Sequence, residues 1–332
     1  DFKVEGIQRA GQPRVTMKDP NNCIEVMTGA MLPIGCDTVI RYEDVSIVKQ
    51  IAHVKTEVQK GQSVHTRGLD AKRGDTLLEP GLVISPAEIS LMASVGRAKT
   101  ESYLGLKTAV ITTGDELVDV NQVPLPHQIR RSNAHVIQSA LLPLGLKSSL
   151  FHLTDDRNKM EKELIKIFVD YNVIIMTGGV SKGKFDFVPE VLEALGVKNL
   201  IHQVSQKPGK PFWFGVSKRQ TVFALPGNPV STFLCFHRYI KPWILKSMGC
   251  ENPAQYAKLG AELEFKQPLT YFLQVRVKND QGVLTAFPQE GGGSGDFTNL
   301  IKVDGFLELP LDKDHFKKGD AFPFIPFRNF FK

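Results

Sequence analysis

The sequence predicts a multidomain protein of the α/β and β class, with a doubly wound α/β domain between two β-rich ends. Three observations support this prediction. The chain has 332 residues, a length typical of several domains. Apolar strand patterns alternate with helical patterns from residue 106 to residue 250, as in a parallel sheet with helices on both faces. Short β-branched runs divided by Gly and Pro fill residues 1–75 and 251–332.

The composition is that of a folded globular protein. Hydrophobic residues make up 42% and charged residues 23%, which excludes an intrinsically disordered chain. The densest apolar run, at residues 173–176, is far shorter than the roughly 18 residues of a membrane-spanning helix. The net charge of +6 is scattered and forms no basic stripe with interleaved aromatic residues. We therefore expect small anionic ligands, and neither nucleic acid nor a membrane, as partners.

The four cysteines are Cys23, Cys36, Cys235 and Cys250, and they form no CxxC pair. No histidine completes a zinc-ligand spacing beside them, so we expect reduced, mostly buried thiols. With no visible signal peptide, the sequence predicts a cytoplasmic protein. The chain starts with Asp1 instead of Met, so we expect a processed product or part of a longer chain.

Short strands are expected in both β-rich ends, at residues 23–27, 37–42, 51–54, 271–277, 282–286 and 305–309. Residues 76–105 connect the first of these ends to the α/β domain. Within this connection Ser85 and Pro86 predict a helix start, because serine accepts hydrogen bonds from free backbone N–H groups and proline suits the first helical position. The helix is expected to end at Val95, before Gly96.

The α/β domain is expected to contain buried strands at residues 107–113, 148–153, 173–176 and 221–225. Ser132 is expected to cap the helix after the first strand, and Asp155 with Asp156 to open the helix after the second. Right-handed crossovers place the loop after each strand on one edge of the sheet. Open α/β sheets bind their ligands at that edge.

Two loops on this edge are expected to bind anions. Gly178 and Gly179 lie between a strand and a helix, where glycine lets the backbone approach a phosphate closely and hydroxyls such as Ser181 add donors. A tight turn that binds nothing is the alternative. In the second loop, residues 226–231, Asn228 is expected to cap the helix and Pro229 to occupy its first position. Helix capping does not explain Pro226, Gly227 or Ser231, so a second anion site is expected here.

Carboxylates and lysines are expected around the same loops. The carboxylates are Asp115, Glu116, Asp155, Asp156 and Asp186. Each alone could be a helix cap or a solvated acidic turn, but together they predict a site for Mg²⁺ and phosphate. Lys207 and Lys210, held by prolines and a glycine, would suit a compact oxyanion. The residues thus indicate a Mg²⁺-assisted enzyme acting on a phosphate-bearing ligand, with a nucleotide-handling binding module as the alternative.

A set of motifs in this order resembles the MoeA family of molybdopterin molybdenumtransferases, to which the gephyrin E domain is related. The matching stretches are residues 27–43, 67–70, 113–117, 177–181, 183–186, 207–211 and 225–231. The resemblance implies four domains: a β-rich domain at 1–75, an elongated connecting domain at 76–105, a MogA-like molybdopterin-binding α/β domain at 106–250 and a C-terminal β-barrel at 251–332. It also implies a homodimer whose cleft uses both subunits.

The reaction that the resemblance implies uses adenylylated molybdopterin, molybdate and Mg²⁺. Molybdenum enters the dithiolene, the phosphoanhydride is hydrolysed, and AMP leaves beside the molybdenum cofactor. An alternative in the same pathway is the molybdopterin adenylyltransferase, which would otherwise be a pathway partner; the flanking β domains argue against it. An interaction scaffold similar to gephyrin is a third possibility, supported here by no linker or partner motif.

The resemblance also implies roles for individual residues. Asp186, Glu116, Asp155 and Asp156 would be catalytic, and the first three would hold Mg²⁺. The contacts to molybdate would come from Lys207, Lys210, Ser231 and Ser294. The pterin and its phosphate would contact Thr28, Asp70, Thr113, Gly114, Asp115, Gly178, Gly179, Ser181, Pro226, Gly227, Asn228 and Pro229, with Thr28 and Asp70 facing the ligand of the partner subunit.

Three departures from the family pattern are visible. The N-terminal Met-Asp-Gly motif, whose aspartate belongs to the active site of the family, is absent from the sequence, so the resemblance leaves open whether this fragment is active. The Tyr-Asp-Thr-Asn motif reads Arg130-Arg131-Ser132-Asn133, which implies altered local ligand contacts. Gln274 replaces an expected arginine, and Arg276, on the same face of a strand, could substitute for it.

Overall fold

The computed structural model describes residues 1–101, 105–180 and 186–328. The chain divides into two compact units, Asp1–Glu79 and Pro80–Lys332. The domain boundaries expected from the sequence remain predictions, and the two units are described separately. In the described part of the chain, no helix combines the length and the apolar character that crossing a membrane requires.

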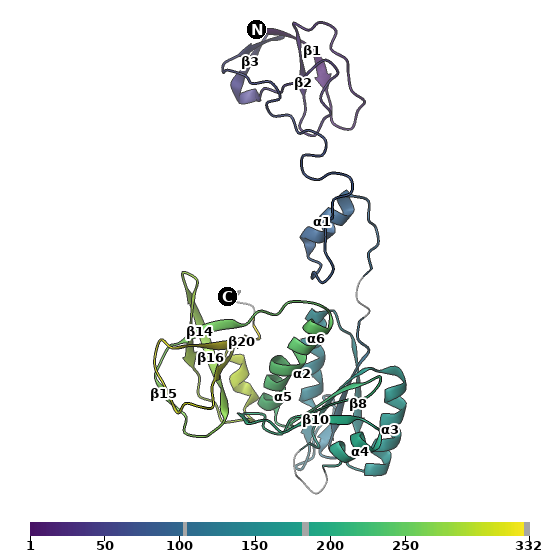
Figure 1. The fold of residues 1–332 in the computed structure, drawn as a ribbon, viewed down its shortest axis with the longest axis vertical. Coiled ribbons are helices and arrows are strands. Elements are labelled where there is room, and N and C mark those ends of the chain that lie inside the picture. Colours follow the sequence, from purple (N-terminus) through teal and green to yellow (C-terminus); the bar gives the residue numbers. More distant parts are fainter. Residues whose placement is uncertain (102–104, 181–185, 329–332) are drawn as a thin grey trace. The chain divides into compact units, whose positions relative to one another are not determined.

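The first unit is built on a four-stranded sheet in the order β2-β1-β4-β3 (Figure 1). The strands are β1 (Phe2–Gln8), β2 (Cys23–Val26), β3 (Val45–Val48) and β4 (Ile51–Val54). The strand expected at residues 37–42 is wrong, because this stretch does not pair with the sheet and leads into a short 3-10 helix, η1 (Tyr42–Asp44). The β3–β4 hairpin turns through Lys49 and Gln50, both with positive φ. This turn lacks the Asn-Gly signal that predicts such hairpins, so the sequence did not reveal β3.

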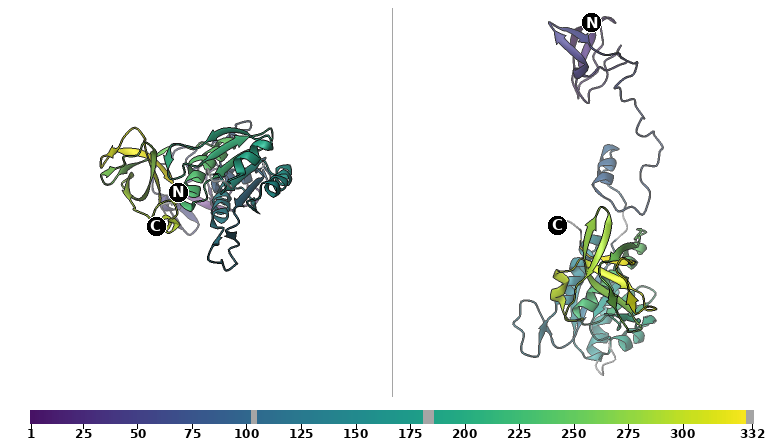
Figure 2. Two further views of the ribbon diagram at one scale, coloured as in Figure 1. Left: turned by 90° about the horizontal axis from the view of Figure 1, so that it is seen from below. Right: turned by 90° about the vertical axis from the view of Figure 1, so that its left-hand side faces the viewer.

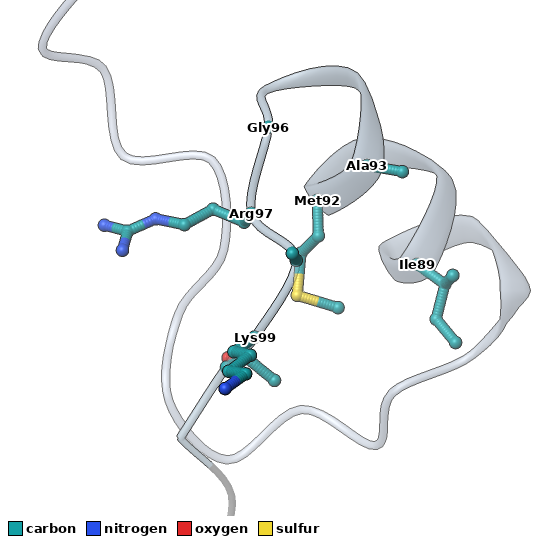
Figure 3. Close-up of a pocket in the computed structure, with 8 residues that line it drawn as sticks. Ile89, Met92, Ala93, Gly96, Arg97 and Lys99 are labelled. Carbon is teal, nitrogen blue, oxygen red and sulfur yellow. The ribbon is translucent and has the colours of Figure 1, made fainter.

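The connecting helix α1 (Pro86–Ser94) begins where the sequence predicts. The Ser85 hydroxyl accepts a hydrogen bond from the Ala87 N–H at 3.1 Å, and the Glu88 carboxylate accepts one from the Ser85 N–H at 2.7 Å. This reciprocal pair is a capping box. None of the nine residues of α1 is buried. A pocket of about 500 Å³ lies beside the helix, lined by Ile89, Met92 and neighbouring residues up to Thr100 (Figure 3).

The α/β domain contains a six-stranded sheet in the order β10-β12-β13-β9-β5-β8 (Figure 1). Four strands run parallel: β5 (Thr108–Thr113), β8 (Ser148–Leu153), β9 (Val173–Thr177) and β13 (Thr221–Leu225). β12 (Trp213–Val216) runs antiparallel to β13 and to the edge strand β10 (Lys198–His202). The doubly wound domain is therefore confirmed, with a two-stranded edge that the sequence did not predict.

The helices cover both faces because the central strands are buried on both. On β5, Ala109 and Ile111 face one apolar cluster and Val110 faces the other, as the period of two in a strand requires. The first cluster includes residues of α3 (Arg157–Asp170) and α4 (Val188–Ala194). The second includes residues of α2 (Ser132–Leu141), the π-helix η3 (Phe236–Ile240) and α6 (Lys241–Ser247). A short 3-10 helix, η2 (Leu142–Leu144), follows α2.

The helix after β13 changes form along its length. α5 (Pro229–Cys235) continues into η3 and then into α6, which contains Pro242 in its first turn. Proline donates no backbone hydrogen bond and disturbs the preceding turn, so the π-helix lies where Pro242 is expected to disturb the helix.

The C-terminal domain is a closed five-stranded barrel. The strands β14 (Gln255–Leu259), β16 (Thr270–Asp280), β17 (Val283–Pro288), β18 (Gly305–Leu309) and β20 (Ala321–Pro326) pair around the ring, and β16 with β18 closes it. β11 (Gln206–Lys207) joins β16 from the α/β domain. Smaller elements are the pair β15 (Leu263–Glu264) and β19 (His315–Phe316), the pair β6 (Leu117–Val118) and β7 (Ile129–Arg130), and the 3-10 helix η4 (Phe297–Ile301).

The barrel packs on the α/β domain through α5. Val230 and Leu234 of α5 form one buried cluster with Phe272 and Phe306 of the barrel. Arg238 and Glu308 form an ion pair across the same junction at 3.0 Å. Both views in Figure 2 show the barrel strands next to the helices of this domain. The junction brings the glycine-rich loop after β17 to the start of α5.

Candidate functional site

The candidate site lies at the carboxyl ends of β5 and β9, which are neighbours in the sheet. The strand of this sheet that follows β5 in the chain, β8, lies on one side of this pair. The strand that follows β9, β10, lies on the opposite side, at the far edge of the sheet past β13. Strand order reverses between these two strands, and open α/β sheets bind ligands in the crevice that such a reversal leaves. The loops predicted to bind anions both adjoin this point.

Gly178 and Gly179 come directly after β9 with φ values of +96° and +66°. A Cβ on Gly178 would lie 2.7 Å from the backbone oxygen and 2.8 Å from the hydroxyl of Thr113, and one on Gly179 would lie 3.0 Å from that hydroxyl. Only glycine fits such an approach in this backbone conformation. The Thr113 hydroxyl is itself buried and, among the residues that the structure describes, has no hydrogen-bond partner. The crevice thus contains an unused polar group beneath the two glycines.

The loop after β13 contacts the loop after β9. A Cβ on Gly227 would lie 3.9 Å from the Cα of Gly178, and the Gly178 N–H donates to the Leu225 carbonyl at 3.1 Å. Pro229 opens α5 as predicted. Side-chain capping by Asn228 is wrong, because its amide donates instead to the Ser294 hydroxyl at 3.0 Å. Ser294 lies in the C-terminal domain, in the loop after β17.

Four carboxylates interact in the segments that follow β5, β8 and β9. Burial raises the pKa of Asp155, and the negative charges of Asp115, Glu116 and Asp186 raise it further. The Asp155 N–H donates to the Asp115 carboxylate at 3.3 Å, and the Glu116 carboxylate lies over Gly114. The structure therefore places these predicted acidic residues near one another. The oxygens are hard donors, the chemistry that Mg²⁺ prefers.

Asp156 differs from the other acids. Its side chain caps α3 by accepting a hydrogen bond from the Lys159 N–H at 3.0 Å, and this backbone hydrogen bond lowers the pKa of the Asp156 carboxyl. Helix capping alone accounts for an acid at this position.

The lysine loop adjoins the first turn of α5. A Cβ on Gly209 would lie 3.7 Å from the Ser231 carbonyl oxygen. Lys210 is exposed, whereas the Lys207 ammonium lies 5.7 Å from the centroid of the Phe265 ring. Ser231 is only 3% exposed. Three of the four predicted molybdate residues thus lie along one loop and one helix turn, where Lys207 and Lys210 are exposed and Ser231 is buried.

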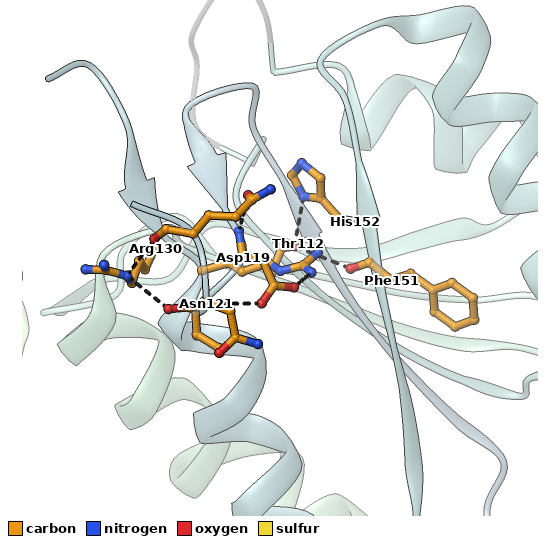
Figure 4. Close-up of polar contacts among 9 residues, drawn as sticks. Thr112, Asp119, Asn121, Arg130, Phe151 and His152 are labelled. Carbon is orange, nitrogen blue, oxygen red and sulfur yellow. Dashed lines mark hydrogen bonds and ion pairs between the residues drawn. The ribbon is translucent and has the colours of Figure 1, made fainter. Parts of the chain in front are cut away.

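The two arginines that depart from the family motif both contact the segment between β6 and β7, and Figure 4 shows the side chain of Arg130 there. Arg131 forms an ion pair with Asp119, and the Arg130 guanidinium donates to the carbonyls of Val120 and Gln122, each at 3.1 Å. Both arginines thus hold the turn between β6 and β7. Ser132 does not cap α2 as predicted, because the N-cap residue is Arg131 and makes no side-chain cap hydrogen bond.

Sequence reasoning missed a polar network beneath the two anion-binding loops. The Asn133 side-chain amide donates to the Gly227 carbonyl at 2.8 Å, to the Thr177 hydroxyl at 3.0 Å and to the Thr232 hydroxyl at 3.3 Å. These residues lie 44 to 99 positions from Asn133 along the chain. The sequence feature that could have indicated this network is an asparagine in the first turn of a helix that begins at the ligand-binding edge of the sheet.

The remaining predicted residues lie elsewhere. Thr28 and Asp70 belong to the first unit; Thr28 is exposed after β2, and Asp70 pairs with His65 at 3.0 Å. Ser181 and residues 183–185 lie outside the described residues. In β16 the side-chain oxygen Oε1 of Gln274 accepts a hydrogen bond from the Asn299 side-chain amide at 3.2 Å, and Arg276 is exposed.

Comparison with known proteins covers nearly the whole chain. Family models match residues 2–96 as the MoeA N-terminal region (domain I and II), 109–246 as a probable molybdopterin binding domain and 256–327 as the MoeA C-terminal region (domain IV). Two curated relatives share the name molybdopterin molybdenumtransferase. The Synechocystis protein is 39% identical over 97% of this chain and 82% of its own length, and the Haemophilus influenzae protein is 31% identical over 99% and 83%.

A solved structure agrees with these matches. The molybdopterin biosynthesis MoeA protein from Pyrococcus horikosii is 28% identical, covers 99% of this chain and 82% of its own, and has a TM-score of 0.79. Together with the crevice between β5 and β9, these likenesses show that the chain belongs to the MoeA family of molybdopterin molybdenumtransferases.

Proposed function

We propose that this chain inserts molybdate into adenylylated molybdopterin and releases AMP in a Mg²⁺-dependent reaction. The observation that carries the proposal is the crevice between β5 and β9. There the glycine loops after β9 and β13 touch, and four interacting carboxylates lie in the segments that follow β5, β8 and β9. Backbone N–H groups beside carboxylates suit a phosphate ester whose neighbouring phosphoanhydride is cleaved.

Each group of residues has a part in this reaction. The backbone at Gly178, Gly179, Gly227 and Asn228 would bind the pterin phosphate, with the Thr113 hydroxyl as a further donor. Lys207 and Lys210 would attract molybdate, because an exposed ammonium binds a compact dianion as a point charge. The carboxylate of Asp186 would orient the water that attacks the phosphoanhydride. AMP then leaves, and the phosphate remains on the cofactor.

Mg²⁺ fits the chemistry of the acidic residues. Asp155, Glu116 and Asp186 would hold the ion, which would neutralise negative charge on the phosphoanhydride when bound. Burial, and after it the negative charges of Asp115, Glu116 and Asp186, raise the pKa of Asp155, and a bound cation would stabilise its carboxylate. Within the described ranges, no group of three or more His, Cys, Asp or Glu side chains is arranged to hold a metal alone. Mg²⁺ ordinarily keeps several waters and takes phosphate oxygens as ligands, so the substrate would complete its shell.

A homodimer belongs to the same proposal. Apolar residues in α1 and in the segment before it are strongly exposed to solvent. Val83 is 70% exposed and Ile89 is 57% exposed. Surfaces of this kind are typical of regions that a partner covers. Thr28 and Asp70 would then face the ligand of the other subunit. We also propose a cytoplasmic location, an adenylyltransferase as the pathway partner that supplies the substrate, and no nucleic-acid partner.

One assay separates the alternatives. The protein is incubated with adenylylated molybdopterin and Mg²⁺, with and without molybdate, and AMP release and activation of an apo-molybdoenzyme are measured. Molybdate-dependent release supports the proposal. Consumption of ATP with free molybdopterin would identify the adenylyltransferase instead, and the absence of both reactions would leave the interaction scaffold.

A further inference from the structure

We infer that Asn133 is a positioning residue: with Thr177 and Thr232, it turns the peptide groups of the loop after β13 so that their N–H groups face the crevice. The inference rests on the proposed function in one respect, namely that the anion bound there is the phosphate of the pterin substrate. None of these three side chains was among the residues predicted for the site.

The first step concerns the direction of the hydrogen bonds. The amide nitrogen of Asn133 can only donate, and it lies within 3.3 Å of the Gly227 carbonyl and both threonine hydroxyls. Because each hydroxyl accepts from the amide, its own proton is directed elsewhere. The Thr177 hydroxyl donates to the Pro226 carbonyl at 3.1 Å, and the Thr232 hydroxyl lies 2.5 Å from the Pro226 carbonyl and 3.1 Å from the Asn228 carbonyl.

The second step concerns three successive peptide groups. The network binds the carbonyls of Pro226, Gly227 and Asn228, and the Thr232 N–H adds a bond to the Asn228 carbonyl at 2.9 Å. Thr177 and Thr232 are 2% and 0% exposed. The Pro226 carbonyl therefore points toward the buried threonine hydroxyls, and the Gly227 carbonyl points toward the amide of Asn133. This arrangement is stable because buried polar groups with complete hydrogen bonds avoid a desolvation cost.

The third step follows from peptide geometry. In a trans peptide the C=O and the next N–H point in opposite directions. Because the Pro226 and Gly227 carbonyls are directed at the network, the N–H groups of Gly227 and Asn228 point away from it. Among the described residues, neither N–H donates to another group. The adjacent Thr113 hydroxyl is also buried, and it has no partner in the part of the chain that the structure describes. These three unused donors suit a phosphate, whose oxygens accept several hydrogen bonds.

The test compares two variants that break the network with matched controls. Thr232→Val removes the hydroxyl and keeps the shape, Thr232→Ser keeps the hydroxyl, and Asn133→Leu removes the amide. If the apolar side chain of Asn133→Leu prevents folding, Asn133→Ala replaces that variant. Ser139→Ala, on the exposed side of α2, controls for the loss of a hydroxyl from this region. Thermal unfolding establishes that each variant folds.

The first measurement is steady-state kinetics with adenylylated molybdopterin at saturating molybdate. We expect KM to rise about tenfold or more in Thr232→Val and Asn133→Leu, because hydrogen bonds to a charged group are lost, with a smaller change in kcat. Thr232→Ser and Ser139→Ala are expected to retain the wild-type KM.

The second measurement does not depend on the reaction. The backbone amide resonances of Gly227 and Asn228 are followed by NMR while inorganic phosphate is added. We expect them to shift in the wild type and in Thr232→Ser, and not in Thr232→Val or Asn133→Leu. Equal shifts in all the variants, or none in the wild type, would overturn the inference. If the wild type shows the shifts but no molybdate-dependent AMP release, the proposed function fails while the inference stands.

Discussion

The side-chain amide of Asn228 donates a hydrogen bond to the hydroxyl of Ser294, with the two atoms 3.0 Å apart. The Ser294 carbonyl also accepts from the Val230 N–H at 3.1 Å. One barrel residue therefore fixes both the residue before α5 and a residue in its first turn. Because Asn228 also supplies backbone to the crevice, the barrel contributes to the shape of the site and not only to stability.

Ser294→Ala is expected to weaken substrate binding without unfolding the protein. The variant loses one hydrogen bond of about 1 kcal/mol, while the apolar contact of Val230 and Leu234 with Phe272 and Phe306 remains. We expect a severalfold rise in the KM for adenylylated molybdopterin and a melting temperature close to that of the wild type. Ser294→Thr, which keeps the hydroxyl, is the control. Wild-type KM in Ser294→Ala would show that the contact does not shape the site.

Gly178→Ala is expected to destabilise the fold by roughly 3 kcal/mol or more, since a Cβ there would contact the backbone oxygen of Thr113 at 2.7 Å in a left-handed conformation. Gly196→Ala is the matched control. Gly196 also has positive φ, at +80°, but a Cβ there meets nothing within 4 Å, so only backbone strain of about 1 kcal/mol is expected. Urea unfolding measures both, and equal losses would contradict the close approach.

His237→Phe is expected to remove part of the acid sensitivity of stability. Burial lowers the pKa of His237 to about 3, and the nearby Lys241 lowers it further; the ring lies among Phe233, Phe236 and Phe327. The unfolded chain takes up a proton near pH 6.5, and the folded protein does not. The stabilisation is therefore complete above pH 6.5 and declines as the pH falls toward 3.

Between pH 7.5 and pH 5 we expect the wild type to lose about 2 kcal/mol that His237→Phe retains. Denaturant unfolding at the two pH values measures the difference. His202→Phe, at an exposed histidine, should behave as the wild type does. Parallel losses in the wild type and His237→Phe would argue against a neutral buried imidazole.

Lys210→Met is expected to raise the KM for molybdate by about tenfold, because the variant loses the ammonium and keeps the length of the side chain. Lys207→Met should have a similar effect, although part of the Lys207 charge interacts with the Phe265 ring. Lys218→Met, at an exposed position outside the lysine loop, serves as the control. An unchanged molybdate KM in Lys210→Met would remove this lysine from the proposed site.

The buried strands were the most predictable part of the fold. The strands expected at residues 148–153 and 221–225 have the bounds of β8 and β13. A short apolar run between turn signals is typical of a buried strand and fits few other structures. β10 and β12 were missed because their pairing depends on partners elsewhere in the sheet. Tertiary pairing of this kind leaves little local pattern.

The loops of the candidate site were predictable from the sequence, whereas the side-chain contacts between distant parts of the chain were not. Glycines and carboxylates after strands indicated the edge of the sheet. The amide of Asn133 contacts residues up to 99 positions away, which no local spacing encodes. The side chain of Asn228 follows the same rule: its local pattern predicts a cap, but a hydroxyl from the barrel binds it instead.

The most direct test of the account is AMP release from adenylylated molybdopterin, measured as a function of molybdate concentration for the wild type and for Asp186→Asn. We expect the wild type to release AMP in proportion to the molybdate inserted, and Asp186→Asn to release almost none while unfolding at the wild-type temperature. AMP release that does not depend on molybdate, or that Asp186→Asn retains, would contradict the account.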